Sequence, residues 1–312
     1  MNGVLETVTE QDQIAINQEP VKRVKTAHRD IACFMIDDSN IDKNTVESFG
    51  QEWKAYHEFG VRDLQRLGDS YFDIVSPEMI HKDSIVADFG CGSGQTKYIA
   101  PRVKKVAAID PSDSIFAADE LLADTPNAEL FKGSISNLPF PDAYFDFGFS
   151  LGVLHHIPDT RQAMVDCVKK IKPGGWFLVY LYYNFEDRGF LFKTLYKLSD
   201  ILRKGISRLP GGMKKFICNI LAVLFYMPFV LFSRLLRFLG VPKKIRSKIP
   251  LHGYEHTSFY IIRNDALDRF GTPLEQRFSR AEITAMMQQS GLSDIRFGTE
   301  IPFWHAVGKK AG

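Results

Sequence analysis

The chain has 312 residues, 45% of them hydrophobic, which is enough to bury the core of one large domain or of one domain with an insertion. Its four cysteines form no CxxC pair, so they predict neither a zinc site nor a disulfide framework and favour a reduced, cytoplasmic compartment. The first residues, MNGVLETVTEQDQ, lack the basic start and apolar run of a signal peptide.

The net charge of +2 conceals an uneven distribution. Fourteen Lys and Arg lie between residues 188 and 248, where the only acid is Asp200, and the rest of the chain is left with 25 basic and 36 acidic residues. An acidic body that carries a basic, apolar segment is typical of proteins that contact a membrane surface or nucleic acid.

In chain order, residues 1–60 are expected to form an N-terminal arm, and 61–80 have helical spacing. Strands and helices then alternate. We expect strands at 84–89, 106–110, 128–133, 143–150 and 176–183, with helices at 95–100, 112–123 and 160–171. This order predicts parallel βαβ units in a doubly wound, Rossmann-like α/β sheet over residues 61–183.

The alternation stops over 184–278 and resumes with a helix at 279–292, which begins with a capping box of Ser279 and Glu282. Two strands follow and are expected to form an antiparallel pair around Pro302. Residues 279–312 are therefore predicted to complete the core. Residues 184–278 are predicted to form a helical, basic and apolar insertion after the fifth strand.

The most informative stretch is VADFGCGSGQ, residues 86–95, which places three glycines between a strand and a helix. Such glycines let the backbone approach a ligand closely. Asp88 precedes the loop, and Asp110 ends the next strand, where a carboxylate can bind both ribose hydroxyls of an adenosine. Asp88 would repel a pyrophosphate but suits an ammonium and a sulfonium, so the pattern favours S-adenosylmethionine over a dinucleotide. A tight turn without a ligand is the alternative.

The segments ADFGCGSGQ, AAIDPS, FKGSISNLPFPDAYFDFGFSLGVLHHIPD and KKIKPGGWFLVY resemble the successive motifs of class I S-adenosylmethionine-dependent methyltransferases. The resemblance is greatest to the type 11 group, which includes ubiquinone and menaquinone methyltransferases. It covers roughly residues 60–183 and, more weakly, 279–310.

This resemblance implies roles for the matching residues. The methionine part of the cofactor would be held by Asp88, Gly90, Cys91, Gly92 and Gly94. The ribose would be held by Asp110, with Pro111 and Ser112 beside the adenine. Ser134 and Ile135 stand where the family often has an Asp and a small residue, and Ser134 can still bond to the adenine amino group. Ser150 and Leu151 would face the methyl group.

Methyl transfer is an in-line displacement in which the protein mainly aligns donor and acceptor. An oxygen acceptor also needs a base, and His155 and His156 follow the fourth strand of the alternating region, at the edge of the sheet where ligands bind. Either histidine is a candidate base. The alternative is that one caps the next helix and the other packs behind the sheet.

Two further groups of residues are candidates for contact with the substrate. In LHGYEHTSF, residues 251–259, His256 is a third candidate base and Tyr254 a substrate contact, although the segment can equally be a surface loop. Its spacing matches no recognised metal-ligand set, and no metal is expected. Phe49, Trp53 and Tyr56 form either a lid over the cofactor, as a similar FGxxW segment in relatives suggests, or simple helix packing.

The apolar run FICNILAVLFYMPFVLF, residues 216–232, is at the lower limit for a transmembrane span, and Pro228 interrupts it. A single crossing would also separate the last strands of the sheet from the first. We therefore expect residues 188–248 to lie on an anionic membrane surface, with 190–206 as an amphipathic helix. A soluble cap over an apolar molecule and a dimer interface are the alternatives. The continuous aliphatic stretches argue against nucleic acid.

Together these patterns predict a cytoplasmic methyltransferase, peripheral on the inner face of the membrane, that methylates an oxygen of an apolar or lipid-linked acceptor. A polyprenyl quinone precursor, a glycolipid and a lipid-linked sugar all fit. The alternatives are a soluble small-molecule methyltransferase of secondary metabolism with a hydrophobic cap, and a non-catalytic binding protein of the same fold. The sequence leaves the acceptor, the methylated atom and the oligomeric state open.

Overall fold

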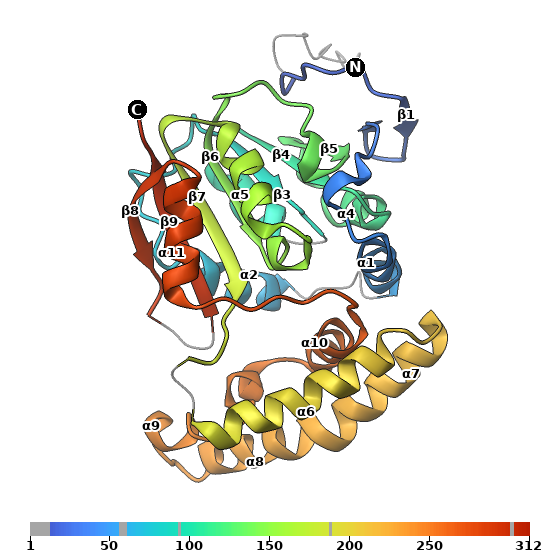
Figure 1. The fold of residues 1–312 in the computed structure, drawn as a ribbon, viewed down its shortest axis with the longest axis vertical. Coiled ribbons are helices and arrows are strands. Elements are labelled where there is room, and N and C mark those ends of the chain that lie inside the picture. Colours follow the sequence, from blue (N-terminus) through green and yellow to red (C-terminus); the bar gives the residue numbers. More distant parts are fainter. Residues whose placement is uncertain (1–12, 56–60, 93–94, 187–188, 300–302) are drawn as a thin grey trace, which may run out of the picture.

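The computed structural model of the chain describes residues 13–55, 61–92, 95–186, 189–299 and 303–312. In this part of the chain, a nine-stranded sheet has the order β1-β2-β5-β4-β3-β6-β7-β9-β8 (Figure 1). The strands are β1 (Lys22–Lys25), β2 (Asp30–Cys33), β3 (Ile85–Phe89), β4 (Lys105–Asp110), β5 (Ala128–Lys132), β6 (Phe145–Leu151), β7 (Ile171–Tyr182), β8 (Leu292–Phe297) and β9 (Phe303–Lys310).

Strands β2 to β7 pair in parallel, whereas β9 runs antiparallel to both β7 and β8. The predicted doubly wound α/β sheet with a C-terminal antiparallel pair is therefore confirmed. The sequence did not predict that the N-terminal arm adds a hairpin, β1 and β2, to the edge of the sheet. In β1 only Val24 is partly buried and the other three residues are exposed, so no alternation of apolar residues marks this strand.

Helices cover both faces of the sheet. On one face, α5 (Thr160–Lys169) and α11 (Arg280–Gln289) pack against fully buried strand residues such as Phe177 and Val179. On the other face lie α2 (Val61–Tyr71), α3 (Gln95–Ile99) and α4 (Ser114–Leu121), around residues such as Leu178 and Ala108. Helix α2 is shorter than the helical spacing of residues 61–80 indicated. It ends at Tyr71, and turns follow it. Alternate residues of the central strands thus supply two separate cores.

Residues 184–278, which we call the cap, leave the sheet and return to it at the same place. Phe278 N donates to Tyr182 O at 2.8 Å, and Asn184 N donates to Phe278 O at 3.0 Å. Tyr183 and Phe278 also form an isolated parallel bridge. Both ends of the cap are therefore tied to the carboxyl end of β7.

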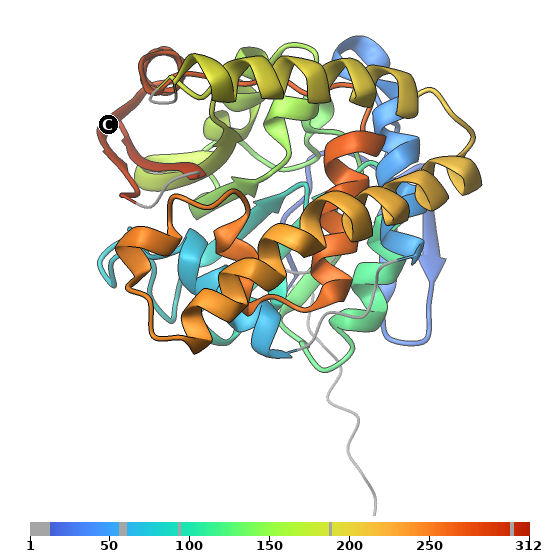
Figure 2. The same ribbon diagram turned by 90° about the horizontal axis from the view of Figure 1, so that it is seen from below.

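The cap is helical. Its elements are α6 (Phe190–Ile206), α7 (Gly211–Leu221), a π turn (Ala222–Tyr226), α8 (Met227–Phe238), α9 (Lys243–Arg246), a 3₁₀ segment (His252–His256) and α10 (Phe259–Gly271). Figures 1 and 2 show α6, α7 and α8 as an outer layer, with α10 between this layer and the sheet. Helix α1 (Lys43–Ala55) contacts α10 from the N-terminal arm.

The segment from α7 through the π turn to α8 is one continuous helix, Gly211–Phe238, and the only one in the described residues that is long and apolar enough to cross a membrane. Its most apolar window of 18 residues has a mean hydropathy of 2.2, and 28% of that window is buried. The buried stripe consists of Cys218, Ala222, Tyr226 and Val230, which pack against Ile262, Ala266, Leu267 and Phe270 of α10. The helix therefore lies along the cap with one face packed and the opposite face exposed.

The packing of the buried stripe can be tested with two neighbouring residues. Ala222 is 0% exposed, whereas Val223 is 50% exposed. We expect Ala222→Leu to lower the free energy of unfolding by about 1–3 kcal/mol, because the added atoms have no space against α10. Val223→Leu should change it by less than about 0.5 kcal/mol. Urea unfolding measures both, and equal effects would contradict the packing.

Candidate active site

The candidate site lies where the strand order reverses. The parallel strands run outward in both directions from the neighbouring pair β3 and β6, so the loops after these two strands diverge at the carboxyl edge of the sheet, which is where folds of this type bind their ligands. Ser150, at the end of β6, is fully buried and donates from its hydroxyl to Phe89 O of β3 at 2.7 Å. Ser150 thus joins the two strands directly beneath the loops.

The glycine loop after β3 needs glycine at two positions. Gly90 has φ of +84° and Gly92 of +48°. A Cβ on Gly90 would also lie 2.6 Å from the Val153 side chain, so the loop after β6 covers the glycine loop at van der Waals distance. Gly90 N donates to Ile109 O at 2.8 Å, which fixes the loop to the end of β4. The predicted ligand Gly94 lies outside the described residues.

Asp88 is 2% exposed at the end of β3 and accepts a hydrogen bond of 2.5 Å from the Thr96 hydroxyl. Burial, together with the charge of Asp110, raises the pKa of Asp88 to about 7, although the hydrogen bonds from Thr96 act in the opposite direction. A buried carboxyl that is costly to ionise is a site that a ligand cation stabilises. The residue therefore fits the ammonium group of S-adenosylmethionine.

Asp110 joins the glycine loop to the turn after β4. Its carboxylate accepts from Gly92 N at 3.2 Å, from Ser112 N at 2.9 Å and from the Ser112 hydroxyl at 2.7 Å. Pro111 is half-buried between them. The carboxylate is thus held at the strand end, where the family would bind a ribose.

The remaining predicted cofactor residues lie at strand ends and loops along this edge of the sheet. Burial raises the pKa of the Cys91 thiol well above its usual value, so the residue acts as a small packed side chain. Ser134 is buried after β5 and accepts from Ser136 N at 3.1 Å, with Ile135 buried beside it. Leu151 is half-buried at the end of β6.

The two adjacent histidines occupy different environments. His155 is fully buried and stacks on Tyr182 with 3.9 Å between ring centroids. Within the described residues neither of its ring nitrogens has a hydrogen-bond partner, and burial lowers its pKa well below the usual value. His156 is also buried, but its Nδ1 lies 2.6 Å from Leu274 O. Of the two, only His156 therefore has a ring nitrogen fixed by a hydrogen bond to a backbone carbonyl among the described residues.

Helix α1 lies between the cofactor turn and the histidines. A Cβ on Gly50 would be 3.6 Å from the Ser112 side chain, and the Phe49 ring meets the His156 ring edge-on at 5.0 Å. The Ser48 hydroxyl reaches Gly271 O of the cap at 3.4 Å. This position is the one that a lid would occupy. The side chains of Trp53 and Tyr56, also predicted for the lid, lie outside the described residues.

The two residues of the cap that were predicted to contact the substrate, His256 and Tyr254, make different contacts. His256 is an exposed residue that contacts Arg237 and Glu255 rather than the other two histidines. The Tyr254 hydroxyl donates to Asp265 of α10 at 2.6 Å. Sequence reasoning missed Asp268 and Tyr182, whose side chains meet at 2.5 Å beside His156. Spacing carries no signal for this pair, because 86 positions separate the two residues.

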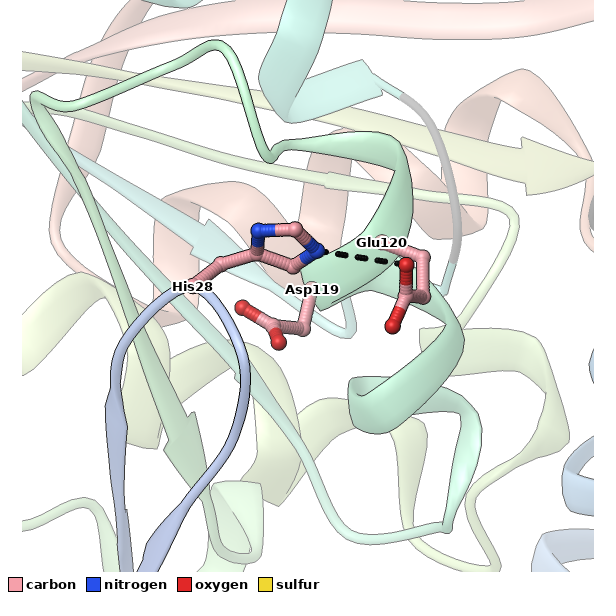
Figure 3. Close-up of side chains that lie close together, drawn as sticks. All are labelled: His28, Asp119 and Glu120. Carbon is pink, nitrogen blue, oxygen red and sulfur yellow. Dashed lines mark hydrogen bonds and ion pairs between the residues drawn. The ribbon is translucent and has the colours of Figure 1, made fainter.

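A cluster of His28, Asp119 and Glu120 has donor atoms close enough together to hold a metal ion (Figure 3). His28 Nε2 lies 3.2 Å from Glu120 Oε2. Asp119, however, is buried and already paired with Arg29 Nε at 2.8 Å. The carboxylate of Asp119 is therefore explained as the partner of Arg29.

Comparison with known proteins agrees with this geometry. Residues 87–179 match the family described as methyltransferase domain. A Mycolicibacterium smegmatis protein described as a probable S-adenosylmethionine-dependent methyltransferase is 32% identical over 95 residues, 30% of this chain and 36% of that protein. A tRNA U34 carboxymethyltransferase of Glaesserella parasuis is 32% identical over 128 residues, 38% of this chain and 40% of the relative.

A third relative is a ubiquinone biosynthesis O-methyltransferase of Nitrosomonas europaea, 28% identical over 149 residues, 45% of this chain and 63% of that enzyme. The chain thus spans between about a third and two thirds of the length of these curated relatives. The names of two of these relatives refer to different substrates, tRNA U34 in one and ubiquinone biosynthesis in the other. The family match over residues 87–179 contains the glycine loop.

The fold is that of a class I S-adenosylmethionine-dependent methyltransferase. Residues 87–179 match the type 11 methyltransferase domain, and this match together with the relatives supports S-adenosylmethionine as the cofactor. Asp88, Asp110 and the glycine loop are the residues that would hold it.

The raised pKa of Asp88 predicts how cofactor affinity depends on pH. Only the ionised carboxylate attracts an ammonium, and the ionised fraction falls as pH decreases through about 7. We expect the dissociation constant for S-adenosylmethionine to rise below this pH, approaching about tenfold per pH unit. Calorimetric titration between about pH 5.5 and pH 8, which brackets the transition, measures this dependence.

The matched control is Asp88→Asn, which keeps the size of the side chain and removes its charge. Binding to this variant should be weaker at pH 8 and nearly independent of pH across the same range. An unchanged pH dependence in Asp88→Asn would assign the effect to another group.

Proposed function

We propose that the chain is a methyltransferase that acts at a membrane surface and transfers a methyl group to an oxygen of an apolar or lipid-linked acceptor. The observation that supports this most is the position of the cap. Asp268 and Leu274, in or just after α10, reach His156 at the carboxyl edge of the sheet, and the opposite side of the cap exposes an apolar face. The cap therefore borders the candidate site on one side and the exterior of the protein on the other.

The apolar face is formed by large side chains on the helix Gly211–Phe238 and on α6. At least 40% of the surface of each is exposed: Leu198, Ile201, Leu202, Met213, Phe216, Ile220, Val223, Leu224, Phe225, Phe229, Leu231, Phe232, Leu235 and Phe238. A shallow groove in it is lined by Phe216, Asn219, Ile220, Val223 and Leu224. A contiguous face of this kind marks contact with a membrane or another apolar surface.

Cations border this face, but several of those counted in the sequence have structural roles. Arg203 is buried and donates to Thr272 O and Pro273 O, and Arg246 is buried against Glu255. Lys214 is buried beside Ser48. The exposed cations are Lys193, Lys197, Lys204, Arg208, Arg237, Lys243, Lys244 and Lys248. All eight are exposed, although Lys204 also pairs with Asp200, and a cation near an anionic lipid surface contributes about 1 kcal/mol.

Two observations bear on the alternatives. A soluble cap over a small apolar substrate would turn its apolar side chains towards the site, whereas this cap turns them outwards. A nucleic-acid acceptor, such as the tRNA in the name of one relative, would favour a wettable cationic face with isolated aromatic residues. Contact with a lipid surface explains the exposed aliphatic side chains and the cations together.

The proposal is tested with tritium-methyl S-adenosylmethionine and a membrane extract of the source cell. After incubation with the protein, the organic and aqueous phases are separated and counted. We expect protein-dependent label in the organic phase, which can then be fractionated to find the acceptor. Label confined to the aqueous phase would contradict a lipid acceptor and favour a soluble one.

A pair of variants separates membrane contact from catalysis. Leu224→Glu places a charge at the centre of the apolar face, and we expect it to lower the organic label about tenfold or more by weakening contact with the membrane. Met35→Glu is the matched control, because Met35 is 71% exposed and lies outside the cap. Both variants should bind S-adenosylmethionine as the wild type does.

A further inference from the structure

The cap contributes polar side chains to the carboxyl edge of the sheet as well as an apolar face. Asp268 of α10 accepts from the Tyr182 hydroxyl through Oδ2 at 2.5 Å and from the Thr272 hydroxyl through Oδ1 at 3.3 Å. Oδ1 also lies 3.9 Å from Nε2 of His156. An insertion that served only as a hydrophobic cover would not need a carboxylate at this point.

The orientation of the His156 ring decides what its two nitrogens can do. Nδ1 lies 2.6 Å from Leu274 O, and a carbonyl oxygen can only accept, so in the neutral ring Nδ1 carries the proton. Nε2 is then left with its lone pair. It is buried and has no hydrogen-bond partner among the described residues. A buried, unpartnered acceptor nitrogen is what a hydroxyl donor can satisfy.

We propose that His156 Nε2 accepts the proton of the acceptor hydroxyl and that Asp268 is the positioning residue, whose carboxylate faces the imidazolium formed. This inference rests on the proposed function and names a hydroxyl as the methylated group. The separation of 3.9 Å exceeds a hydrogen bond, so the neutral ring keeps its lone pair free for the acceptor. The carboxylate remains close enough to stabilise a positive charge.

The transfer then balances as follows. The acceptor O–H bond breaks, its proton moves to Nε2, and the oxygen forms a bond to the methyl carbon. The bond between that carbon and sulfur breaks, and its electron pair stays on sulfur, so the cofactor leaves as a neutral thioether. The imidazolium later returns its proton to solvent, which can reach Asp268, since 22% of the Asp268 side chain is exposed.

The charges of His156 and Asp268 depend on the ionisable groups around them. These groups are Asp265 on α10, Glu275 and Arg277 in the segment after α10, Tyr180 and Tyr182 on β7, His155 after β6 and Tyr71 on α2. Burial raises the pKa of Asp268, and Asp265 and Glu275 raise it further, whereas His156 and Tyr182 favour its ionised form. Protonation of Asp268 as pH falls would remove the negative charge that faces the imidazolium. The rate of methyl transfer should therefore decrease at acidic pH.

The kinetic test uses Asp268→Asn, which keeps the bond to Tyr182 possible and removes the charge. With the lipid fraction that takes up label and saturating S-adenosylmethionine, we expect kcat to fall about 10- to 100-fold, with cofactor affinity unchanged and the acidic fall in rate lost. Asp265→Asn is the matched control, since Asp265 lies one turn earlier on α10 and bonds to Tyr254 instead. Because Asp265 raises the pKa of Asp268, this variant should move the acidic fall in rate to lower pH, and its kcat at neutral pH should fall less than about threefold. Equal losses in the two variants would overturn the proposal.

A second measurement needs no acceptor and therefore decides the inference even if no lipid is methylated. Nitrogen NMR of the free protein should show the neutral His156 ring protonated on Nδ1. Carbon NMR of the Asp268 carboxyl should show its titration moving to higher pH in His156→Gln, because the histidine favours the ionised carboxylate. A ring protonated on Nε2, or an unchanged titration of Asp268, would overturn the pairing while leaving the methyltransferase activity untouched.

Discussion

The arrangement of this protein depends on one constraint, the hydrogen bonds that join the two ends of the cap. Tyr182 and Phe278 are bonded to each other through their backbones, and β9 then pairs with β7 along its length. Because both ends are fixed at the carboxyl end of β7, the helices between them must remain over the edge where the cofactor loop lies. The same bonds explain why the apolar helix cannot cross a bilayer once, since the chain must return to the strand that it left.

Packing then divides the cap into two faces. Small side chains such as Cys218 and Ala222 let the long helix approach α10 closely, and the larger residues beside them are left pointing outwards. Helix α10 in turn places Asp268 against Tyr182 and His156. One layer of helices therefore lies between the edge of the sheet that carries the cofactor loop and an exposed apolar surface, and a substrate that is apolar at one end and hydroxylated at the other suits both.

The sequence predicted the core because its signals are local. Buried strands, the glycine loop and the carboxylates Asp88 and Asp110 follow one another at fixed intervals, and each lies at the end of its strand as expected. The hairpin β1–β2 was missed because an exposed edge strand has no apolar alternation. The pairing of His156 with Asp268 was missed because it depends on how the cap folds back over the sheet, which no spacing records. The count of cations overstated the basic surface, since residues such as Arg203 are buried in structural bonds.

The most direct test of the account is the position of the cap relative to a membrane. The four cysteines are all buried, so single spin labels can be placed at Leu224→Cys on the apolar face and at Lys104→Cys on the exposed surface of the core. With anionic vesicles, the account predicts that the label at 224 enters the lipid to a depth of about 5–10 Å while the label at 104 stays in water. Two labels that both remain in water would contradict membrane contact. A label at 224 near the centre of the bilayer would contradict a cap that lies on its surface.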